Sequence, residues 1–208
     1  MRDGRSFSNR HVVASQHGKA IFSMSASFHE NEQGFEHFEQ MPDVPPPEDL
    51  ASDEDLRRQL FENPDLPEKI RRYWQRERPI EVRPLKLRAP IAPEKGDPQQ
   101  SVWIKATGAL PDITAMHQCV LAYASDYTLL DTALLPHGRW VLDPTVQSAS
   151  LDHALWLHRP FRADEWLLYV QTSPNANGAR GFARGSVFDR QGQLIASVAQ
   201  EGLIRDRA

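Results

Sequence analysis

Cysteine is almost absent from this sequence, and its scarcity limits how the fold can be stabilised. Cys119 is the only cysteine among 208 residues, so no disulfide can form within the chain. Chains without disulfides are typical of reducing compartments. The sequence also lacks a signal-peptide pattern at its start and a peroxisomal address at its end. These absences predict a cytoplasmic protein.

Long apolar runs and an excess of positive charge are missing as well. No run approaches the roughly 20 apolar residues that cross a bilayer, so we expect no membrane span. The formal net charge is −4, which gives no general attraction to nucleic acid, and none is predicted as a partner. No nucleophile elbow, Walker loop or dinucleotide fingerprint occurs. What is present is an ordinary globular composition, long enough for one or two domains.

Alternating and helical patterns divide the chain into two structured blocks joined by a linker. The first block is a hairpin whose second strand alternates apolar residues with serines. A proline-rich stretch at 41–47 follows, and then two short helices at 53–61 and 68–76, the first capped by Ser52. The expected strands lie at 5–15, 20–28, 80–88, 101–107, 146–158, 166–173, 180–189 and 193–205, and a helical pattern covers 113–127.

The second block has the order β-β-α-β-β-β-β, in which an antiparallel sheet wraps around one apolar helix. That order indicates an α+β fold. Almost no charged residue interrupts the helical pattern, so we expect a mostly buried helix and a buried, inert Cys119 thiol. The predicted divisions are a terminal hairpin at 1–40, a linker with short helices at 41–78 and a complete domain at 79–208.

The opening hairpin resembles the closing hairpin, which suggests a duplicated domain. Chance similarity is the alternative, because the identities are few. The aligned stretches are Arg5-Ser6-Phe7 with Arg180-Gly181-Phe182, Val12 with Val187, Gly18 with Gly192, Ile21 with Ile195, and Ser23 with Ser197. If the duplication holds, the first copy is a hairpin that cannot bury one face by itself.

Two polar residues stand out because they interrupt apolar patterns. Asp126 follows the apolar helix, where a carboxylate is costly unless it is paired or used; a cap for the next turn is the alternative. Gln200 lies by parity on the apolar face of the last strand with Leu194 and Val198, and its counterpart in the opening hairpin is Ala26. A buried amide needs partners, so Gln200 is either a core amide bonded to backbone or part of a site.

The other candidates carry weaker signals. His153 and His158 are five residues apart on an expected strand, which places them on opposite faces and argues against a shared metal. The stretch at 71–76 mixes cations with aromatic rings. It could touch RNA or a nucleotide phosphate, but a solvated helix face is the favoured interpretation. Ser150 lies on an expected strand, and nothing in its own neighbourhood distinguishes it.

A series of short motifs runs in order along essentially the whole chain. They are RDGRSFS (2–8), GFEH (34–37), RPIEVRP (78–84), YASD (123–126), LPHG (135–138), LDH (151–153), WLHRPF (156–161), EWLLY (165–169), ARGF (179–182) and QEG (200–202). Each motif alone is modest, but together they make the chain similar to the acyl-CoA thioesterase II family, whose members are double hot-dog proteins.

The resemblance implies a hot-dog fold, with a complete C-terminal hot dog and the last hairpin of an incomplete N-terminal one, because family members carry an earlier segment. It implies hydrolysis of acyl-CoA thioesters without a metal or bound cofactor. The family's three catalytic residues fall by motif on Asp126, Ser150 and Gln200. The implied substrate is a medium- to long-chain acyl-CoA. Hot-dog sheets commonly associate through their edges, so a homo-oligomer is expected.

These roles suggest that Asp126 accepts a proton from water, while Ser150 and Gln200 hold that water at the thioester carbon. Two other functions stay open. One is a non-catalytic acyl-CoA-binding or assembly protein; the other is an enoyl-CoA hydratase or dehydratase, although that chemistry usually relies on a histidine with a carboxylate. Three arginines are candidates for the coenzyme A phosphates: Arg159, Arg180 and Arg184.

Overall fold

The computed structural model describes residues 2–64, 66–88 and 94–207. The chain divides into two compact units, residues 1–37 and 38–208, and each is described by itself. Among the described residues, no helix combines the length and the hydropathy that crossing a bilayer requires.

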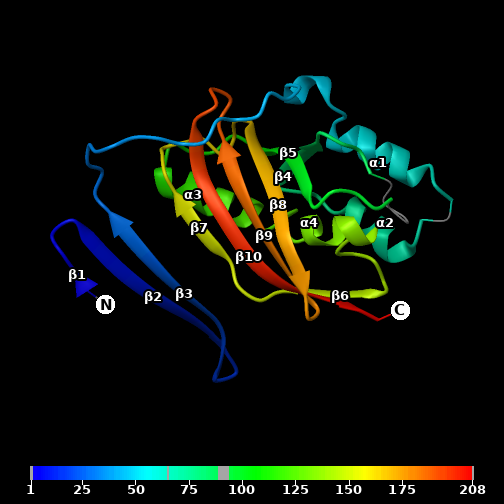
Figure 1. The fold of residues 1–208 in the computed structure, drawn as a ribbon, viewed down its shortest axis with the longest axis horizontal. Helices are drawn as coiled ribbons and strands as arrows, with labels where there is room; N and C mark the ends of the chain where they lie inside the picture. The colour runs from blue at the N-terminus through cyan, green and yellow to red at the C-terminus, as the bar shows by residue number, and fades with distance from the viewer. Residues whose placement is uncertain (1, 65, 89–93, 208) are drawn as a thin grey trace. The chain divides into compact units, whose positions relative to one another are not determined.

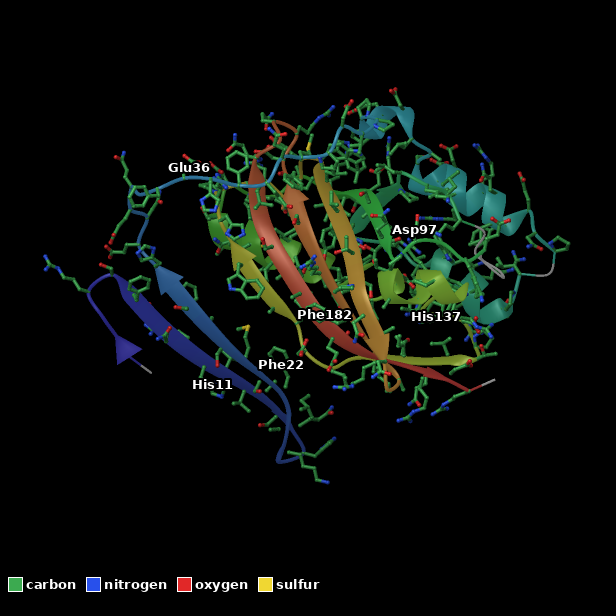
Figure 2. The ribbon with its side chains drawn as sticks, in the orientation of Figure 1. His11, Phe22, Glu36, Asp97, His137 and Phe182 are labelled. Atoms are coloured by element: carbon green, nitrogen blue, oxygen red, sulfur yellow. The ribbon has the colours of Figure 1, made fainter. Side chains whose placement is uncertain are left out.

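The first unit is a small antiparallel sheet dominated by one hairpin (Figure 1). β2 (Phe7–Gln16) pairs with β3 (Lys19–His29), and the short β1 (Arg2–Asp3) pairs with β2. His17 and Gly18 have φ values of 50° and 75°, as a two-residue type I′ turn requires. The predicted hairpin is therefore confirmed. Its apolar face stays 44–55% exposed at Val12, Phe22, Met24 and Phe28 (Figure 2 labels Phe22).

The second unit is a curved antiparallel sheet with helices on its concave face, as Figure 1 shows. In the part of the chain that the structure describes, the strand order is β4-β5-β8-β9-β10-β6, and β7 pairs with β10 beside β6. The strands are β4 (Ile80–Pro84), β5 (Gln99–Ala106), β6 (Val146–Ser150), β7 (Ala154–Leu157), β8 (Leu167–Asn177), β9 (Arg180–Phe188) and β10 (Leu194–Asp206). The predicted α+β architecture is confirmed.

The predicted strand at 146–158 is wrong, because it is two strands separated by a break. Asp152 causes the break: its Oδ1 accepts a hydrogen bond from the Glu201 backbone N–H at 2.7 Å. The Glu201 carbonyl in turn accepts from the backbone N–H groups of Leu151 and Asp152. A side chain thus replaces one rung of the ladder, and β6 and β7 pair with β10 on either side of it.

The helices are short, and two begin with recognisable signals. The predicted Ser52 cap of α1 (Asp53–Phe61) is confirmed, because Ser52 and Asp55 form a reciprocal capping box. Pro67 precedes α2 (Glu68–Gln75). α3 (Thr114–Ala124) ends before the predicted pattern does, and η1 (Pro47–Asp49), α4 (Asp131–Leu134) and η2 (Leu135–His137) were not predicted.

The prediction of a mostly buried central helix is wrong. Of α3, only His117, Leu121 and Ala124 are buried against the sheet. Met116 and Tyr123 are exposed, and so is the Cys119 thiol, which corrects the prediction of a buried cysteine. The reason is geometric: the apolar residues of α3 run around the whole helix, whereas one sheet covers one stripe of it.

The proline-rich stretch has no helix or strand before η1, as its composition predicts, yet it is anchored to the sheet. The Trp103 indole N–H donates to the Pro45 carbonyl at 3.0 Å, and the Arg83 guanidinium donates to the Pro47 carbonyl at 2.7 Å. Met41 and Val44 pack against the apolar cluster on the convex face, which contains Trp103 and Phe188. Both faces of the sheet are therefore covered at this end.

The two hairpins share a β-bulge at the same residue type. In β3 the register shifts at Ile21, and in β10 it shifts at Ile195, so the alignment of the second strands is confirmed. The alignment of the first strands is wrong by two residues, because superposing the bulges matches Val12 with Gly185. The β10 bulge also corrects the predicted face of Leu194, which packs on the convex side.

Candidate active site

Asp126, Ser150 and Gln200 come from separate elements and meet at one point. Asp126 follows the end of α3, Ser150 ends β6, and Gln200 lies in the middle of β10. The Ser150 hydroxyl donates to Asp126 Oδ1 at 3.3 Å, and the Gln200 amide Nε2 lies 3.1 Å from Ser150 Oγ. The same Nε2 donates to Asp126 Oδ1. An acid, an alcohol and an amide thus form one closed hydrogen-bonded cluster.

Strand register brings the alcohol and the amide together. Ser150 pairs with Gly202 across the β6–β10 ladder, and Gly202 is two residues from Gln200 on the same face. Gln200 is 1% exposed and shares that buried face with Ala196 and Val198, as parity predicts. A Cβ at position 202 would lie 2.5 Å from Leu130 Cδ1, so a larger residue there would force the buried Leu130 side chain to move.

The amide of Gln200 is bound by side chains and not by backbone groups. A carboxylate accepts hydrogen bonds and cannot donate them, so the amide nitrogen must face Asp126. Within the part of the chain that the structure describes, Gln200 Oε1 is buried and has no hydrogen-bond partner. That oxygen is an unsatisfied acceptor, which a core amide held only for stability would not keep.

The surroundings of Asp126 differ from the sequence-based expectation. We expected an apolar setting, but Asp126 and Ser150 are both exposed and only Gln200 is buried. The apolar helix ends at Ala124, and the chain then turns so that Asp126 projects past the helix end. The carboxyl group at this position is accessible to water.

Ser125 anchors the turn that carries Asp126. It is fully buried; its hydroxyl donates to the Ala122 carbonyl at 2.9 Å, and its own carbonyl accepts from the Tyr169 hydroxyl at 3.0 Å. Burial raises the pKa of Tyr169, with a smaller contribution from the Asp126 charge, so this phenol stays protonated and remains a donor. These bonds of Ser125 fix the backbone that carries the Asp126 carboxylate.

His153 is a contact that sequence reasoning missed. Its Nε2 lies 2.8 Å from the Ser125 hydroxyl. Since that hydroxyl donates to the Ala122 carbonyl, the imidazole is the donor, with its proton on Nε2. Burial lowers the pKa of His153, while the charges of Asp126 and Asp152 oppose that shift. The one sequence signal that pointed to His153 was its position, three residues after the candidate Ser150.

A second polar cluster lies beneath the helices, and sequence reasoning missed it too. Gln171 on β8 is fully buried and accepts from the Gln100 amide at 2.9 Å and the Thr132 hydroxyl at 3.1 Å. Its own amide donates to the Thr128 hydroxyl at 2.6 Å. These bonds tie the start of α4 to the sheet, so they support the chain that follows Asp126.

The remaining candidates do not join the cluster. The His158 ring Nε2 lies 2.8 Å from the Ser197 hydroxyl, apart from the contact that His153 makes. Across residues 2–64, 66–88 and 94–207, no group of three or more His, Cys, Asp or Glu side chains could hold a metal ion. In the basic stretch, Arg71 stacks on Phe61 and Arg72 lies 3.7 Å from Glu68.

The three arginines considered for the coenzyme A phosphates each have protein contacts. Arg159 donates to the Leu194 carbonyl at 2.7 Å and stacks on Phe38. Arg180 pairs with Glu201 at 3.1 Å, and Arg184 lies 3.4 Å from the Thr172 hydroxyl. The structure therefore does not single out one of them.

The chain is similar to known acyl-CoA thioesterases. A family model described as acyl-CoA thioesterase matches residues 71–203. Acyl-CoA thioesterase 2 of Haemophilus influenzae is 41% identical over 205 residues, which are 99% of this chain and 71% of that protein. Acyl-coenzyme A thioesterase 8 of Rattus norvegicus is 44% identical, and the match covers 99% of this chain and 66% of that protein. The chain thus spans 66–71% of the length of these two relatives.

Solved structures confirm the hot-dog fold. A crystal structure of an acyl-CoA thioesterase II from Mycobacterium marinum matches with a TM-score of 0.76 and 42% identity, over 99% of this chain and 71% of that one. A protein from Alicyclobacillus acidocaldarius described as having a hot-dog fold matches with a TM-score of 0.73 at 21% identity, over 100% of this chain and 70% of that one. At 21% identity, this second match supports a shared fold and not a shared function.

Proposed function

Because the chain belongs to the acyl-CoA thioesterase family, we propose that it hydrolyses acyl-CoA thioesters to a free fatty acid and coenzyme A. The observation that carries the proposal is the hydrogen-bonded cluster of Asp126, Ser150 and Gln200. Thioester hydrolysis needs a water molecule made nucleophilic and a carbonyl oxygen stabilised as it gains charge. The cluster offers one base and two groups that can orient water.

In the proposed mechanism, Asp126 is the general base. Its carboxylate accepts a proton from water as the water oxygen bonds to the thioester carbon. The tetrahedral intermediate then collapses, the C–S bond breaks, and the leaving sulfur takes the proton back from Asp126. Base catalysis of this kind contributes roughly 10²–10⁴-fold.

Ser150 and Gln200 have complementary roles in this mechanism. The amide of Gln200 donates to both partners, which holds the carboxylate and the hydroxyl in one orientation. The Ser150 hydroxyl can both donate and accept a hydrogen bond. It can therefore stay bonded to Asp126 whether or not the carboxyl group carries the proton.

One observation favours a second candidate function. Asp126 and Ser150 are exposed, whereas electrostatic catalysis is strongest where water is excluded. The alternative is therefore a protein that binds acyl-CoA, or assembles with partners, without turning the thioester over. Assembly into a homo-oligomer and a cytoplasmic location belong to the proposal, as does the division into a terminal hairpin at 1–40, a linker at 41–78 and a catalytic domain at 79–208.

Thiol release from palmitoyl-CoA separates these readings. The enzyme proposal predicts release of free coenzyme A together with palmitic acid. The binding alternative predicts saturable binding with no thiol release. With a 2-enoyl-CoA as the substrate, a 3-hydroxyacyl-CoA product in place of free acid would instead show a hydratase.

A further inference from the structure

A cavity of about 380 Å³ lies between α1, α2 and the β4–β5 end of the sheet. Val82 and Val102 line it on the side of the sheet, and Leu60 lines it on the side of α1. A cavity of this size falls in the range of small-molecule sites. Its lining includes none of the three residues of the proposed catalytic cluster, which are Asp126, Ser150 and Gln200.

The charges around this cavity are mostly positive. Four cationic side chains line it, whereas Asp131 is the one acidic residue among the described residues of the lining. The cations are Arg78, Lys86, Arg88 and Arg139. Since the whole chain has a formal net charge of −4, this excess of positive charge is local. A hollow lined by one sign of charge attracts ligands of the opposite sign, so the lining favours an anion.

Two of the four cations have no carboxylate partner in the protein. Arg139 pairs with Asp143 at 3.3 Å, but Lys86 and Arg88 form no salt bridge with any residue that the structure describes. Arg88 is partly buried, and its guanidinium lies against Gly96, where a Cβ would come within 2.6 Å of Nη1. Arg88 can therefore offer a charge-assisted hydrogen bond to an anion in the cavity.

Aromatic rings form much of the remaining wall. They belong to Tyr73, Trp74, Tyr127 and Trp140. The Arg78 guanidinium stacks on Trp74, 3.8 Å from the ring centroid, and lies 5.1 Å from the ring centroid of Tyr73. Contacts between aromatic rings stabilise a complex beyond the area that they bury, and guanidinium groups also stack on aromatic faces. The lining therefore favours a guest with flat rings.

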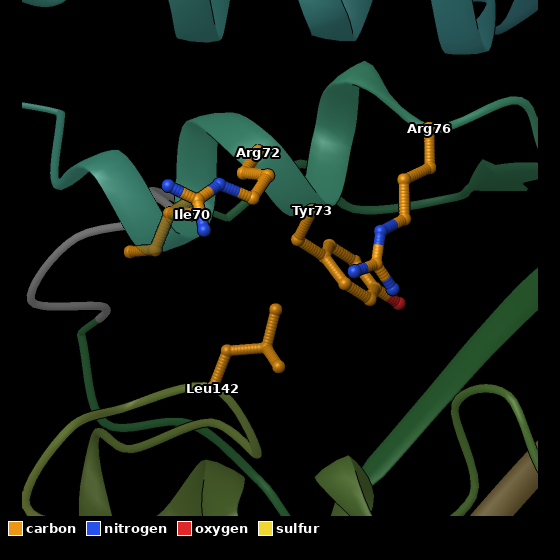
Figure 3. Close-up of a pocket in the computed structure, with 5 residues that line it drawn as sticks. All are labelled: Ile70, Arg72, Tyr73, Arg76 and Leu142. Carbon is orange, nitrogen blue, oxygen red and sulfur yellow. The ribbon is translucent and has the colours of Figure 1, made fainter.

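A smaller cavity of about 350 Å³ adjoins the first one and extends its positive charge. Figure 3 shows Tyr73 on α2 and Leu142 on the facing loop, and these two residues line both cavities. Arg72 and Arg76, four residues apart, line the smaller one. Among the described residues, its lining includes no carboxylate.

We propose that the larger cavity is a second binding site, separate from the catalytic cluster, for a planar aromatic anion. The rings of such a ligand would pack among the aromatic side chains, and its charged group would contact Arg88 and Lys86. The inference does not depend on the proposed function, because none of the observations that support it involves the thioester.

Titration of the full chain with anilinonaphthalene sulfonate tests the site, because this aromatic anion becomes fluorescent in apolar surroundings. Arg88→Gln should weaken binding about tenfold, the effect of losing one charge-assisted hydrogen bond. Lys95→Gln is the matched control, since Lys95 is exposed and does not line the cavity; it should change the affinity by less than about twofold. Circular dichroism checks that both variants fold. Equal affinities in the two variants would overturn the assignment.

Two further measurements test the chemistry of the ligand. Tyr73→Leu keeps an apolar side chain but removes a ring, so it should weaken binding of the sulfonate about threefold. Neutral phenylnaphthylamine, which has the same rings without the sulfonate, should bind equally to the wild type and to Arg88→Gln. An unchanged affinity in Tyr73→Leu would overturn the preference for rings. An equal loss for the neutral compound in Arg88→Gln would overturn the preference for an anion.

Competition tests whether the site is separate from the catalytic cluster. The thioether S-dodecyl-CoA, a non-hydrolysable analogue of the proposed substrate, should leave the Arg88-dependent binding of anilinonaphthalene sulfonate unchanged. Displacement of the fluorophore by the thioether would overturn a separate site.

Discussion

The hairpins β2–β3 and β9–β10 have the same local sequence pattern but differ in how far their apolar faces are buried. Both bulge at an isoleucine, and both alternate apolar residues along one face. In β9–β10 that face is covered by α3 and α4, and Ile195 is 0% exposed; in β2–β3 Ile21 is 63% exposed. Local sequence therefore specifies the strand and its bulge, whereas the elements packed on it decide whether its face becomes a core.

The same comparison locates the candidate site. At equivalent positions after the bulge, β3 carries Ala26 and β10 carries Gln200. Only the second hairpin has a neighbouring strand that brings Ser150 and a helix end that brings Asp126. The glutamine thus lies in the hairpin whose neighbouring elements supply an alcohol and a carboxylate.

Of the substitutions that compare the two hairpins, the largest effect is expected at this pair of positions. Gln200→Met keeps nearly the same volume but removes the donor to Asp126 and Ser150. We expect kcat for dodecanoyl-CoA to fall roughly 100–1,000-fold, as when an oriented donor is removed from an active site. The reciprocal change Ala26→Gln should leave kcat unchanged. Full activity in Gln200→Met, with an unchanged circular dichroism spectrum, would contradict its role.

The next effect concerns stability, and the two bulge isoleucines provide the matched pair. Ile195→Ala should lower the free energy of unfolding by about 2–5 kcal/mol, because it opens a cavity in the core. Ile21→Ala should change it by no more than about 0.5 kcal/mol, because the side chain is exposed. Urea unfolding followed by circular dichroism measures both. Equal destabilisation would mean that the first hairpin is also covered in solution.

A smaller effect is expected at His153, which supports the site from the β6–β7 break. His153→Ala removes the donor to the Ser125 hydroxyl, a bond worth about 0.5–1.5 kcal/mol. We expect kcat to fall up to about tenfold with KM unchanged, and His153→Gln to restore most of it. A parallel change in KM, or no rescue by glutamine, would contradict a positioning role.

A pH dependence of stability is expected from Asp131 in the second unit. Burial raises the pKa of Asp131 from 3.8 to about 6, although the Val141 N–H opposes the shift. The folded state therefore binds more protons than the unfolded state between these values, and stability falls as the pH rises through about 6. Asp131→Asn should remove that fall. Urea unfolding at pH 4.5 and 7.5 tests it, and an unchanged difference in the variant would exclude Asp131 as the cause.

Much of the fold could be predicted because alternation and helical spacing are local properties. The two hairpins, the α1 cap and the order of strands were readable in this way. The break between β6 and β7 was not, because it depends on Asp152 reaching a backbone group of β10. The exposure of α3 was not either, because it depends on what covers the helix and not on its own sequence.

The residues of the candidate site also differ in whether the sequence alone could identify them. Gln200 and Asp126 interrupt apolar patterns and could be singled out from the residues alone. Ser150 looks like any serine on a strand, and only the family resemblance pointed to it. Gln100, Thr132 and Gln171 resemble surface residues by type, and only packing brings them into one buried cluster.

The most direct test of the account is the hydrolysis of dodecanoyl-CoA by Asp126→Asn. Asparagine keeps the shape and an oxygen that can accept from Gln200, but it cannot take a proton from water. We predict a fall in kcat of roughly 10²–10⁴-fold, with unchanged folding and unchanged affinity for S-dodecyl-CoA. Undiminished hydrolysis by this variant would contradict the claim that Asp126 activates the water.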